Sequence, residues 1–539
     1  MKKFNFWLLV LGFILIGMPV FSAAQRDTEA PATGPVVGSG APGAPFSYPI
    51  TSGGRVTYWQ QVQGVWASNF SNLGHTPMAQ RLMQLTGVEI EYLHPPAGTQ
   101  VEAFNLMVAS GEYPDIIQFN FHTSFPGGAT RALNDGIVIP LNDVIDRWAP
   151  NLRAFLNERP DIDRSVRTDD GYYYTFPFVR GHDRLLFSSG PIIRKDWLDD
   201  LGFDLPRTLD EVYRILVAFR DIKGASAPYT AAGGATGQFV YPFGQEGAFY
   251  VDDDGRVRHG ALEPGYRRYL ETMAQWYREG LLDGDLFSVN AATATTKITT
   301  GVSGISAGSI NAQMMTWNIA GRRTDPNFTL AMFPALTLNQ GERPRFSNGD
   351  LPYGTNTISM TGISTQCSNV ELAARFLDFG YTHDGHMLFN FGIEGTTYTM
   401  VNGVPTYTDY ILNNPQGISM ANILGGYALA GSGGPFVQNV GVVDQGIDQY
   451  EAVIARDTIT APWILRHKMP IISLTPAESS ELAQIMSGVN TFISERNARY
   501  ILGTEAFSTY DNYMATLRSM GLPRAIEIQN AALTRFNRR

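Results

Sequence analysis

The sequence predicts an α/β protein with two α/β units and a helical C-terminal region. Strand-like and helix-like segments alternate between Val56 and Phe119, and a second such stretch begins at Ile192. A long helical pattern follows Thr475 and leads into two shorter ones. Alternating strands and helices are typical of a doubly wound unit with a parallel sheet. In such sheets, ligands bind beyond the carboxyl ends of the strands, so these ends are the first places to search for a site.

The first unit contains three expected strands and two expected helices. The strands are predicted at 56–62, 88–93 and 114–119, and the helices at 76–86 and 99–109. Thr76-Pro77 caps the first helix. Trp59 lies near the end of the first strand, and Phe121 and His122 follow the third. These three residues are candidate ligand contacts, with packing between helix and sheet as the alternative for the aromatic rings.

The second unit also begins with capped helices. A capping box at Thr208-Leu209-Asp210-Glu211 predicts a helix that runs to Arg220. Further along, a strand at 304–309 runs into a Gly-Ser turn and then a helix that contains Trp317. A strand–glycine–helix junction exposes backbone N–H donors, so Ser309 and Trp317 are candidate contacts for a polar ligand. Local helix packing is the alternative, and a phosphate is disfavoured because no P-loop motif is present.

Charge and cysteine content exclude several classes of partner and chemistry. The 539 residues include 40 Lys and Arg against 50 Asp and Glu, a net charge of −10. Without Lys2 and Lys3 the count is 38 against 50, or −12. Nucleic acids and anionic membranes need basic patches, so neither is expected as a partner. The single cysteine, Cys367, cannot form an intramolecular disulfide or a thiolate metal cluster.

The N-terminus has the pattern of a secretory signal peptide. Lys2 and Lys3 precede an apolar run, and Ser22-Ala23-Ala24 offers small residues at a cleavage site before Gln25. An uncleaved membrane anchor is the alternative, although the apolar run is short for a membrane span. Residues 25–54 are rich in Pro, Gly and Ala, and we expect them to form a disordered tether.

Recognisable catalytic motifs are missing. The sequence has no GxSxG, HExxH or Walker A motif, and no GxGxxG after a strand. Two acids that meet in space leave no sequence spacing, so a secreted glycoside hydrolase stays as the alternative function. The run from Val251 to Gly255 lacks the end carboxylates of a calcium loop, so we expect a hairpin turn there. His383 and His386 have a spacing that suggests a metal site.

One stretch resembles a known family. Asn390-Phe391-Gly392-Ile393-Glu394-Gly395, then Tyr398 and a hairpin turn at Asn402-Gly403, resembles a signature of the extracellular solute-binding proteins of ABC importers, in family 1 and its LipO-like branch. Phe391 replaces the usual Tyr. Segments at 140–215, 376–410 and the C-terminal block resemble the same family, so the likeness covers most of the mature chain. The family's acid-Gly-His helix holds no metal, and we expect neither metal nor cofactor here.

The resemblance implies a two-lobe periplasmic-binding-protein-like (type II) fold with a cleft between the lobes. It places lobe 1 at 55–175 and 335–380, and lobe 2 at 176–334 and 381–539, with chain crossings near 172–178 and 328–336. Glu394 and Tyr398 are then expected near the cleft mouth as ligand contacts. Aromatic and amide side chains suit a sugar, so an oligosaccharide or sugar derivative is the favoured solute, with a peptide as the alternative.

The implied function is transport without catalysis. The protein is expected to close on its solute by a hinge motion and to deliver it to the permease subunits of an ABC importer. Many members of the LipO-like branch carry a lipid-modified cysteine after the signal peptide, and this sequence has none there. We therefore expect a free, monomeric protein in the periplasm or outside the cell.

Overall fold

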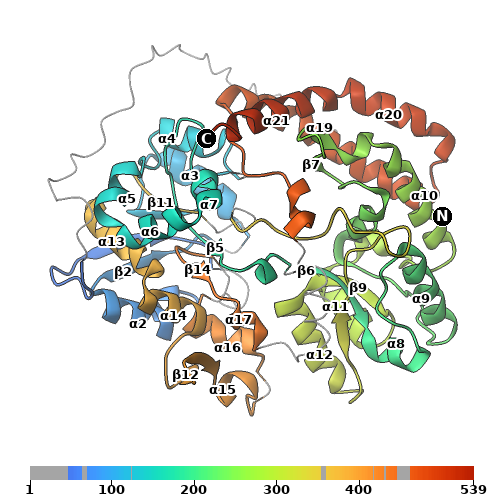
Figure 1. Ribbon diagram of the computed structural model, residues 1–539, viewed down its shortest axis with the longest axis horizontal. Helices are drawn as coiled ribbons and strands as arrows, with labels where there is room; N and C mark the ends of the chain where they lie inside the picture. The colour runs from blue at the N-terminus through green and yellow to red at the C-terminus, as the bar shows by residue number, and fades with distance from the viewer. Residues whose placement is uncertain are drawn as a thin grey trace, which may run out of the picture.

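The protein consists of two α/β lobes with a layer of C-terminal helices across one side of both (Figure 1). The computed structural model describes residues 46–62, 70–96, 98–122, 124–187, 189–353, 360–416, 418–429, 433–445 and 462–539. Within these residues, no helix combines the length and apolar character that a membrane crossing requires. The predicted signal peptide and most of the predicted tether lie outside the described residues.

Lobe 1 is built on a five-stranded sheet with the order β2-β1-β3-β11-β4. Its strands are β1 (Arg55–Trp59), β2 (Glu89–Leu93), β3 (Ile116–Gln118), β4 (Phe176–Pro177) and β11 (Met360–Ile363). The first three run parallel, and β11 is antiparallel to both of its neighbours. The doubly wound pattern predicted for the first unit is therefore confirmed.

Helices cover lobe 1 on both faces and extend to its lower end. They are α2 (Pro77–Thr86), α3 (Gln100–Ser110), α4 (Gly128–Asn134), α5 (Asn142–Trp148), α6 (Pro150–Glu158), α7 (Pro160–Ser165), α13 (Val370–Asp378), α14 (His383–Phe391), α15 (Asp409–Leu412) and α16 (Met420–Tyr427). The hairpin of β12 (Tyr398–Val401) and β13 (Val404–Tyr407) follows α14. Asn402 and Gly403 both have positive φ, as the predicted tight turn requires.

Lobe 2 is built on an antiparallel three-stranded sheet with the order β10-β6-β9. These strands are β6 (Ser189–Arg194), β9 (Ile305–Ser309) and β10 (Leu330–Met332), and a second hairpin joins β7 (Phe249–Val251) to β8 (Val257–His259). The helices are α8 (Lys195–Leu201), α9 (Leu209–Asp221), α10 (Pro264–Arg278), α11 (Ala291–Thr299) and α12 (Met315–Arg322). The capping box of Thr208 and Glu211 opens α9 as predicted, and the β7–β8 pair confirms the hairpin turn.

Along the residues that the structure describes, the chain passes between the two lobes at three places. The connections follow β5 (Val179–Arg180), β10 and β14 (Val437–Gln438), and β5 and β14 pair with each other in parallel. After β14 the chain forms α17 (Gly441–Asp444) and later a short helix at Pro462–His467. The prediction that 328–336 is itself a crossing is wrong, because β10 pairs with β6 inside the lobe 2 sheet.

Two parts of the predicted lobe division are also wrong. Leu336 belongs to the core of lobe 2, and the backbone N–H of Thr337 donates to the carbonyl of Arg207, so the segment after β10 still belongs to lobe 2. The region 381–429 belongs to lobe 1, since α14 and α16 both pack on α2. The sequence predicted the helix that contains His383 and His386, but not the surface against which it packs.

The last residues of the predicted tether are ordered against lobe 1. Ile50 is buried, and its backbone N–H donates to the carbonyl of Thr86 at 2.8 Å. The Tyr48 hydroxyl donates to the carbonyl of Arg375 at 2.6 Å, and its ring contacts Phe379. Apolar groups at these positions bury enough surface to bind the segment, so the prediction of a disordered tether is wrong for these residues.

The C-terminal helices α19 (Pro476–Ile501), α20 (Tyr510–Ser519) and α21 (Leu522–Phe536) contact both lobes. Helix α19 packs along α10 in lobe 2 and also reaches α4 in lobe 1. The end of α21 lies over lobe 1 (Figure 1), where Arg535 and Arg539 donate to the carboxylate of Asp169 at 2.7 and 2.6 Å. The side chain of Arg539 is only 4% exposed. This ion cluster is a non-covalent tie between the lobes.

Candidate functional site

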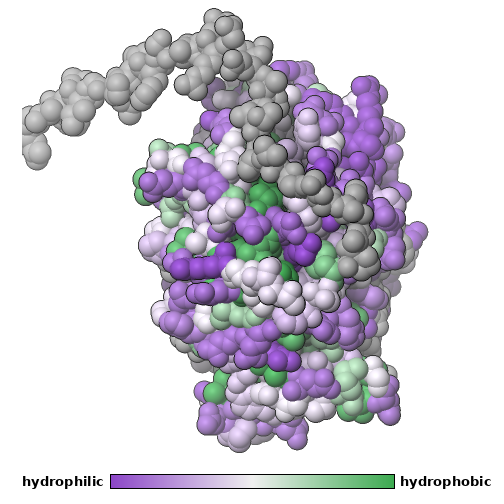
Figure 2. Space-filling view, turned by 90° about the vertical axis from the view of Figure 1, so that its left-hand side faces the viewer, coloured by the Kyte–Doolittle hydropathy of each residue, from purple (hydrophilic) through white to green (hydrophobic). Residues whose placement is uncertain are grey.

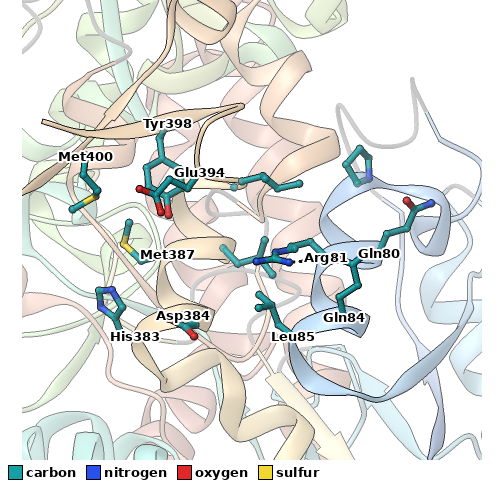
Figure 3. A pocket seen from close by; sticks show the side chains of 14 residues that line it. Gln80, Arg81, Gln84, Leu85, His383, Asp384, Met387, Glu394, Tyr398 and Met400 are labelled. Atoms are coloured by element: carbon teal, nitrogen blue, oxygen red, sulfur yellow. Dashed lines mark hydrogen bonds between the residues drawn. The ribbon is translucent and has the colours of Figure 1, made fainter. Parts of the chain in front are cut away.

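A groove of about 580 Å³ lies between α2, α14 and the start of β12 (Figure 3). We call it the α2–α14 groove. It is lined by Pro77, Gln80, Arg81, Gln84, Leu85, His383, Asp384, Met387, Leu388, Gly392, Ile393, Glu394, Tyr398 and Met400. Its volume is in the range of small-ligand sites. All of these residues belong to lobe 1, so closure of the lobes would not enclose this groove.

Two helix caps and one glycine with positive φ determine where the walls of the groove begin and end. Thr76 caps α2, whose spacing places Gln80, Arg81 and Gln84 on one face. Thr382 caps α14 in the same way. Gly392 ends α14 with φ 89° and ψ −129°, a conformation that favours glycine. A Cβ atom at this position would lie 2.6 Å from Thr397 Oγ1, so only glycine lets the chain turn back here.

Charged groups from both walls face the Tyr398 side chain. Tyr398 is 5% exposed, and its side chain lies beside that of Glu394 (Figure 3). Burial raises the pKa of Tyr398, the carboxylates of Glu394 and Asp384 raise it further, and the guanidinium of Arg81 opposes them. Arg81 donates to Gln84 Oε1 at 3.3 Å across a turn of α2. Among the described residues, neither Asp384 nor Glu394 has an ion-pair partner.

Two predicted site residues, His122 and Ser309, follow or end strands of lobe 1 and lobe 2. His122 follows β3, and its backbone N–H donates to Asn120 Oδ1 at 3.1 Å. Burial lowers the pKa of His122 to about 4, helped by the guanidinium of Arg539 from the C-terminal helix. Ser309 ends β9 opposite Ser189, the first residue of β6 after a connection between lobes. Its backbone N–H donates to Gln313 Oε1 at 2.7 Å. Both positions are compatible with a ligand held between the lobes.

The aromatic residues predicted at the sheet ends lie in cores instead. Trp59 is 7% exposed and packs against Phe104 and Phe119. Phe121 is fully buried and contacts the same two rings. Packing between helix and sheet, the alternative given for Trp59, therefore describes its surroundings, because α3 covers this end of the sheet with Phe104. A ligand contact by either residue stays an untested prediction.

Trp317 is also part of a core. It is 2% exposed, and its Nε1–H donates to Thr295 Oγ1 at 2.9 Å. The surrounding cluster includes Ile298, Met314 and Phe328 from lobe 2. Local helix packing, the alternative given for Trp317, therefore describes its surroundings.

Sequence patterns did not reveal the ion pairs at the connections. Arg180 in β5 lies 3.1 Å from the carboxylate of Asp350, and Arg184 lies 3.0 Å from that of Asp444. Each pair joins the first connection to a later one. Because the partners are far apart in the chain, no local spacing signals them. The sequence also gave no sign that α2 forms one wall of the groove, because α2 is far in the chain from α14 and β12.

The two histidines considered as metal ligands have different surroundings. His383 is exposed and lines the groove, whereas His386 is half-buried and its Nε2 lies 3.0 Å from Asn439 Nδ2. Across the described residues, no group of three or more His, Cys, Asp and Glu side chains is arranged to hold a metal ion.

Comparisons with known proteins agree on one family. The model of the bacterial extracellular solute-binding proteins matches residues 76–387. The chain is 23% identical over 478 residues to the fructooligosaccharide ABC transporter substrate-binding protein FusA of Streptococcus pneumoniae, covering 82% of this chain and 84% of FusA. It is 23% identical over 331 residues to the polygalacturonan/rhamnogalacturonan-binding protein YtcQ of Bacillus subtilis, covering 59% of this chain and 63% of YtcQ.

Solved structures show the same fold. The alginate-binding protein AlgQ2 superposes with a TM-score of 0.73 at 24% identity, covering 89% of this chain and 98% of AlgQ2. FusA in complex with kestose superposes with a TM-score of 0.72 at 19% identity, covering 90% of this chain and 99% of FusA. At this identity the likeness establishes the two-lobe fold alone.

Proposed function

Because the chain belongs to the bacterial extracellular solute-binding proteins, we propose that it captures an oligosaccharide between its two lobes for an ABC importer. The match to the family model over residues 76–387 is the observation that carries the proposal. Relatives named for binding fructooligosaccharide and polygalacturonan or rhamnogalacturonan favour a sugar polymer fragment as the solute. Nothing in these comparisons favours the alternative of a glycoside hydrolase.

The arrangement of the connections supports capture by hinge motion. Three chain segments join the lobes, and β5 and β14 pair beside each other. Two lobes joined by a few parallel segments can rotate as rigid bodies around them. His122 of lobe 1 and Ser309 of lobe 2 are proposed ligand contacts. The solute would be bound and released without covalent change.

Calorimetric titration with defined oligosaccharides tests the proposal. We expect one of three sets, fructo-, galacturono- or alginate oligosaccharides, to bind at a single site with a Kd in the micromolar range or tighter, that is, about −8 kcal/mol or more favourable. Mass spectrometry of the recovered sugar should show it intact. A cleaved sugar would support the hydrolase, and no binding to any polar solute would refute capture.

Export is proposed on the same basis. The first 24 residues would act as a signal peptide, and the mature protein would begin at Gln25 without a lipid. Intact mass of the protein recovered from an extracytoplasmic fraction tests this directly. A diacylglycerol adduct, or the full-length precursor in membranes, would contradict it.

A further inference from the structure

Asn390, near the end of α14, places a fully buried amide against β14. Its Nδ2 donates to the carbonyl of His386, one turn back in α14, at 2.8 Å and to the carbonyl of Val437 at 3.0 Å. Its Oδ1 accepts from the backbone N–H of Asn439 at 2.7 Å. Carbonyls can only accept and the N–H can only donate, so these partners fix which way the amide points. The side chain therefore joins two segments of the backbone and is not available to a solute.

The amide of Asn390 acts as a partner strand for β14. On one edge of β14, the carbonyls of Phe436 and Gln438 accept from backbone N–H groups of β5 and the residue after it, at 3.0 and 3.1 Å. The other edge presents the carbonyl of Val437 and the N–H of Asn439, which are the two groups that Asn390 binds. Strand β14, where the third connection between the lobes begins, is thus held on both edges by lobe 1.

Further hydrogen bonds extend this attachment to α17. The Oδ1 of Asn439 accepts from the N–H of Gly441, the first residue of α17, at 2.8 Å, and its Nδ2 lies 3.0 Å from Nε2 of His386. Gln445, directly after α17, accepts from the N–H of Tyr407 in β13 at 2.7 Å. Seen from the side of lobe 1, the lower end that carries this hairpin protrudes from the molecule (Figure 2). Both ends of α17 are therefore bonded to lobe 1.

The two lobes meet α17 through different residues. Val442 packs in an apolar cluster of lobe 1, whereas Val443 packs in the lobe 2 cluster that contains Trp317. The carboxylate of Asp444 lies 3.0 Å from Arg184 of the first connection, and both side chains are partly exposed. Apolar contacts are non-directional, and a partly exposed ion pair is weak. Lobe 2 can therefore shift against α17 more easily than α17 can leave lobe 1.

We infer that Asn390 is a positioning residue for solute capture: its amide holds β14, and through Asn439 the start of α17, on lobe 1, so that lobe 2 rotates against a fixed third connection. This inference rests on the proposed function, because a hinge matters only to a protein that closes on its solute. Without the amide, the free protein samples more arrangements of the lobes. Closure then costs more entropy, and the solute binds less tightly although none of its contacts is lost.

The variant N390L tests the inference, because it removes the three hydrogen bonds of the amide and nearly keeps its size. Spin labels are attached to cysteines introduced at Leu106 in α3 and Ile319 in α12, which are exposed and belong to different lobes. Without solute, pulsed electron resonance on the full chain should show a wider distance distribution in N390L than in the wild type. Calorimetry uses fructo-, galacturono- and alginate oligosaccharides. The set that binds the wild type should bind N390L with a Kd roughly tenfold higher.

A matched control separates positioning from stability. The side chain of Asp378 is also fully buried, and it accepts from the backbone N–H of Leu152 at 2.8 Å, which joins α13 to α6 inside lobe 1. D378L should lower the melting temperature as N390L does, yet keep the distance distribution and the solute affinity of the wild type. N439A removes only a partly exposed side chain and should fold. It should raise the Kd about threefold and widen the distances less than N390L.

The outcomes distinguish this inference from the proposed function. An unchanged distance distribution and Kd in N390L and N439A, or an equal change in D378L, overturns the role of Asn390 and leaves solute capture intact. If N390L does not fold, N439A decides by itself. A wild type that binds none of the oligosaccharides refutes the proposed function, and the distances measured without solute then still decide whether Asn390 positions the connection.

Discussion

Replacing Trp317 by alanine tests whether this residue is part of a core or a ligand contact. The indole is 2% exposed, and it packs against Gly308 so closely that a Cβ there would lie 3.3 Å from it. Truncating a buried tryptophan costs about 3–5 kcal/mol of folding free energy. The hydrogen bond to Thr295 adds little, because Thr295 is partly exposed and water can replace the indole N–H.

Thermal unfolding without ligand measures this cost. At roughly 2–4 °C per kcal/mol, W317A should lower the melting temperature on the order of 10 °C. The control W317F keeps most of the ring volume and should lose less than half as much. A near-normal melting temperature in W317A, together with weaker solute binding, would refute the core assignment and restore the site predicted from the sequence.

Three further predictions follow from single groups. Burial raises the pKa of Asp378 to about 6, against 3.8 unfolded. Its stabilising contribution is therefore present below about pH 4 and lost as pH rises through 6. Wild type should lose stability relative to D378N, whose amide does not ionise, as pH rises over that range in denaturant titrations, and a constant difference would contradict this. G392A should lower stability by about 1–3 kcal/mol, because a Cβ would lie 2.6 Å from Thr397 Oγ1 on a backbone of positive φ; the control G395A shares the positive φ, 78°, but has open space and should cost less, and melting temperatures that are equal would contradict this. D169N leaves Arg535 and the buried Arg539 without their shared carboxylate and should cost about 1–3 kcal/mol, whereas R524A removes only the exposed pairs with Glu481 and Glu527 and should cost less; an equal loss would show that the tie is unimportant.

Local chemistry was predictable from the sequence, and long-range packing was not. The caps at Thr76 and Thr208 and the turn at Asn402-Gly403 form as expected, because each depends on a few neighbouring residues. Trp59 was ambiguous, since an aromatic ring at a strand end can face a ligand or a helix, and only the position of Phe104 decides between them. The cluster of Asp169 with the C-terminal arginines joins residues distant in the chain, which no local pattern signals.

In the candidate site, too, the local motif was predictable from the sequence and the packing was not. The motif around Glu394 and Tyr398 predicted a functional surface, and the two residues do line one groove. Their assignment to the mouth of the cleft depended on placing 381–429 in lobe 2. The packing of α14 on α2 puts them in lobe 1 instead, in a groove that one lobe forms alone.

Closure of the lobes on a solute is the central claim, and one distance tests it most directly. The only cysteine of the chain, Cys367, is buried, so spin labels can be attached to cysteines introduced at Val404 in the lobe 1 hairpin and at Ile319 in α12, both exposed. Pulsed electron resonance should show the distance between these ends shorten and its distribution narrow when the oligosaccharide identified by calorimetry is added. An unchanged distance distribution at saturating solute would contradict capture by hinge closure.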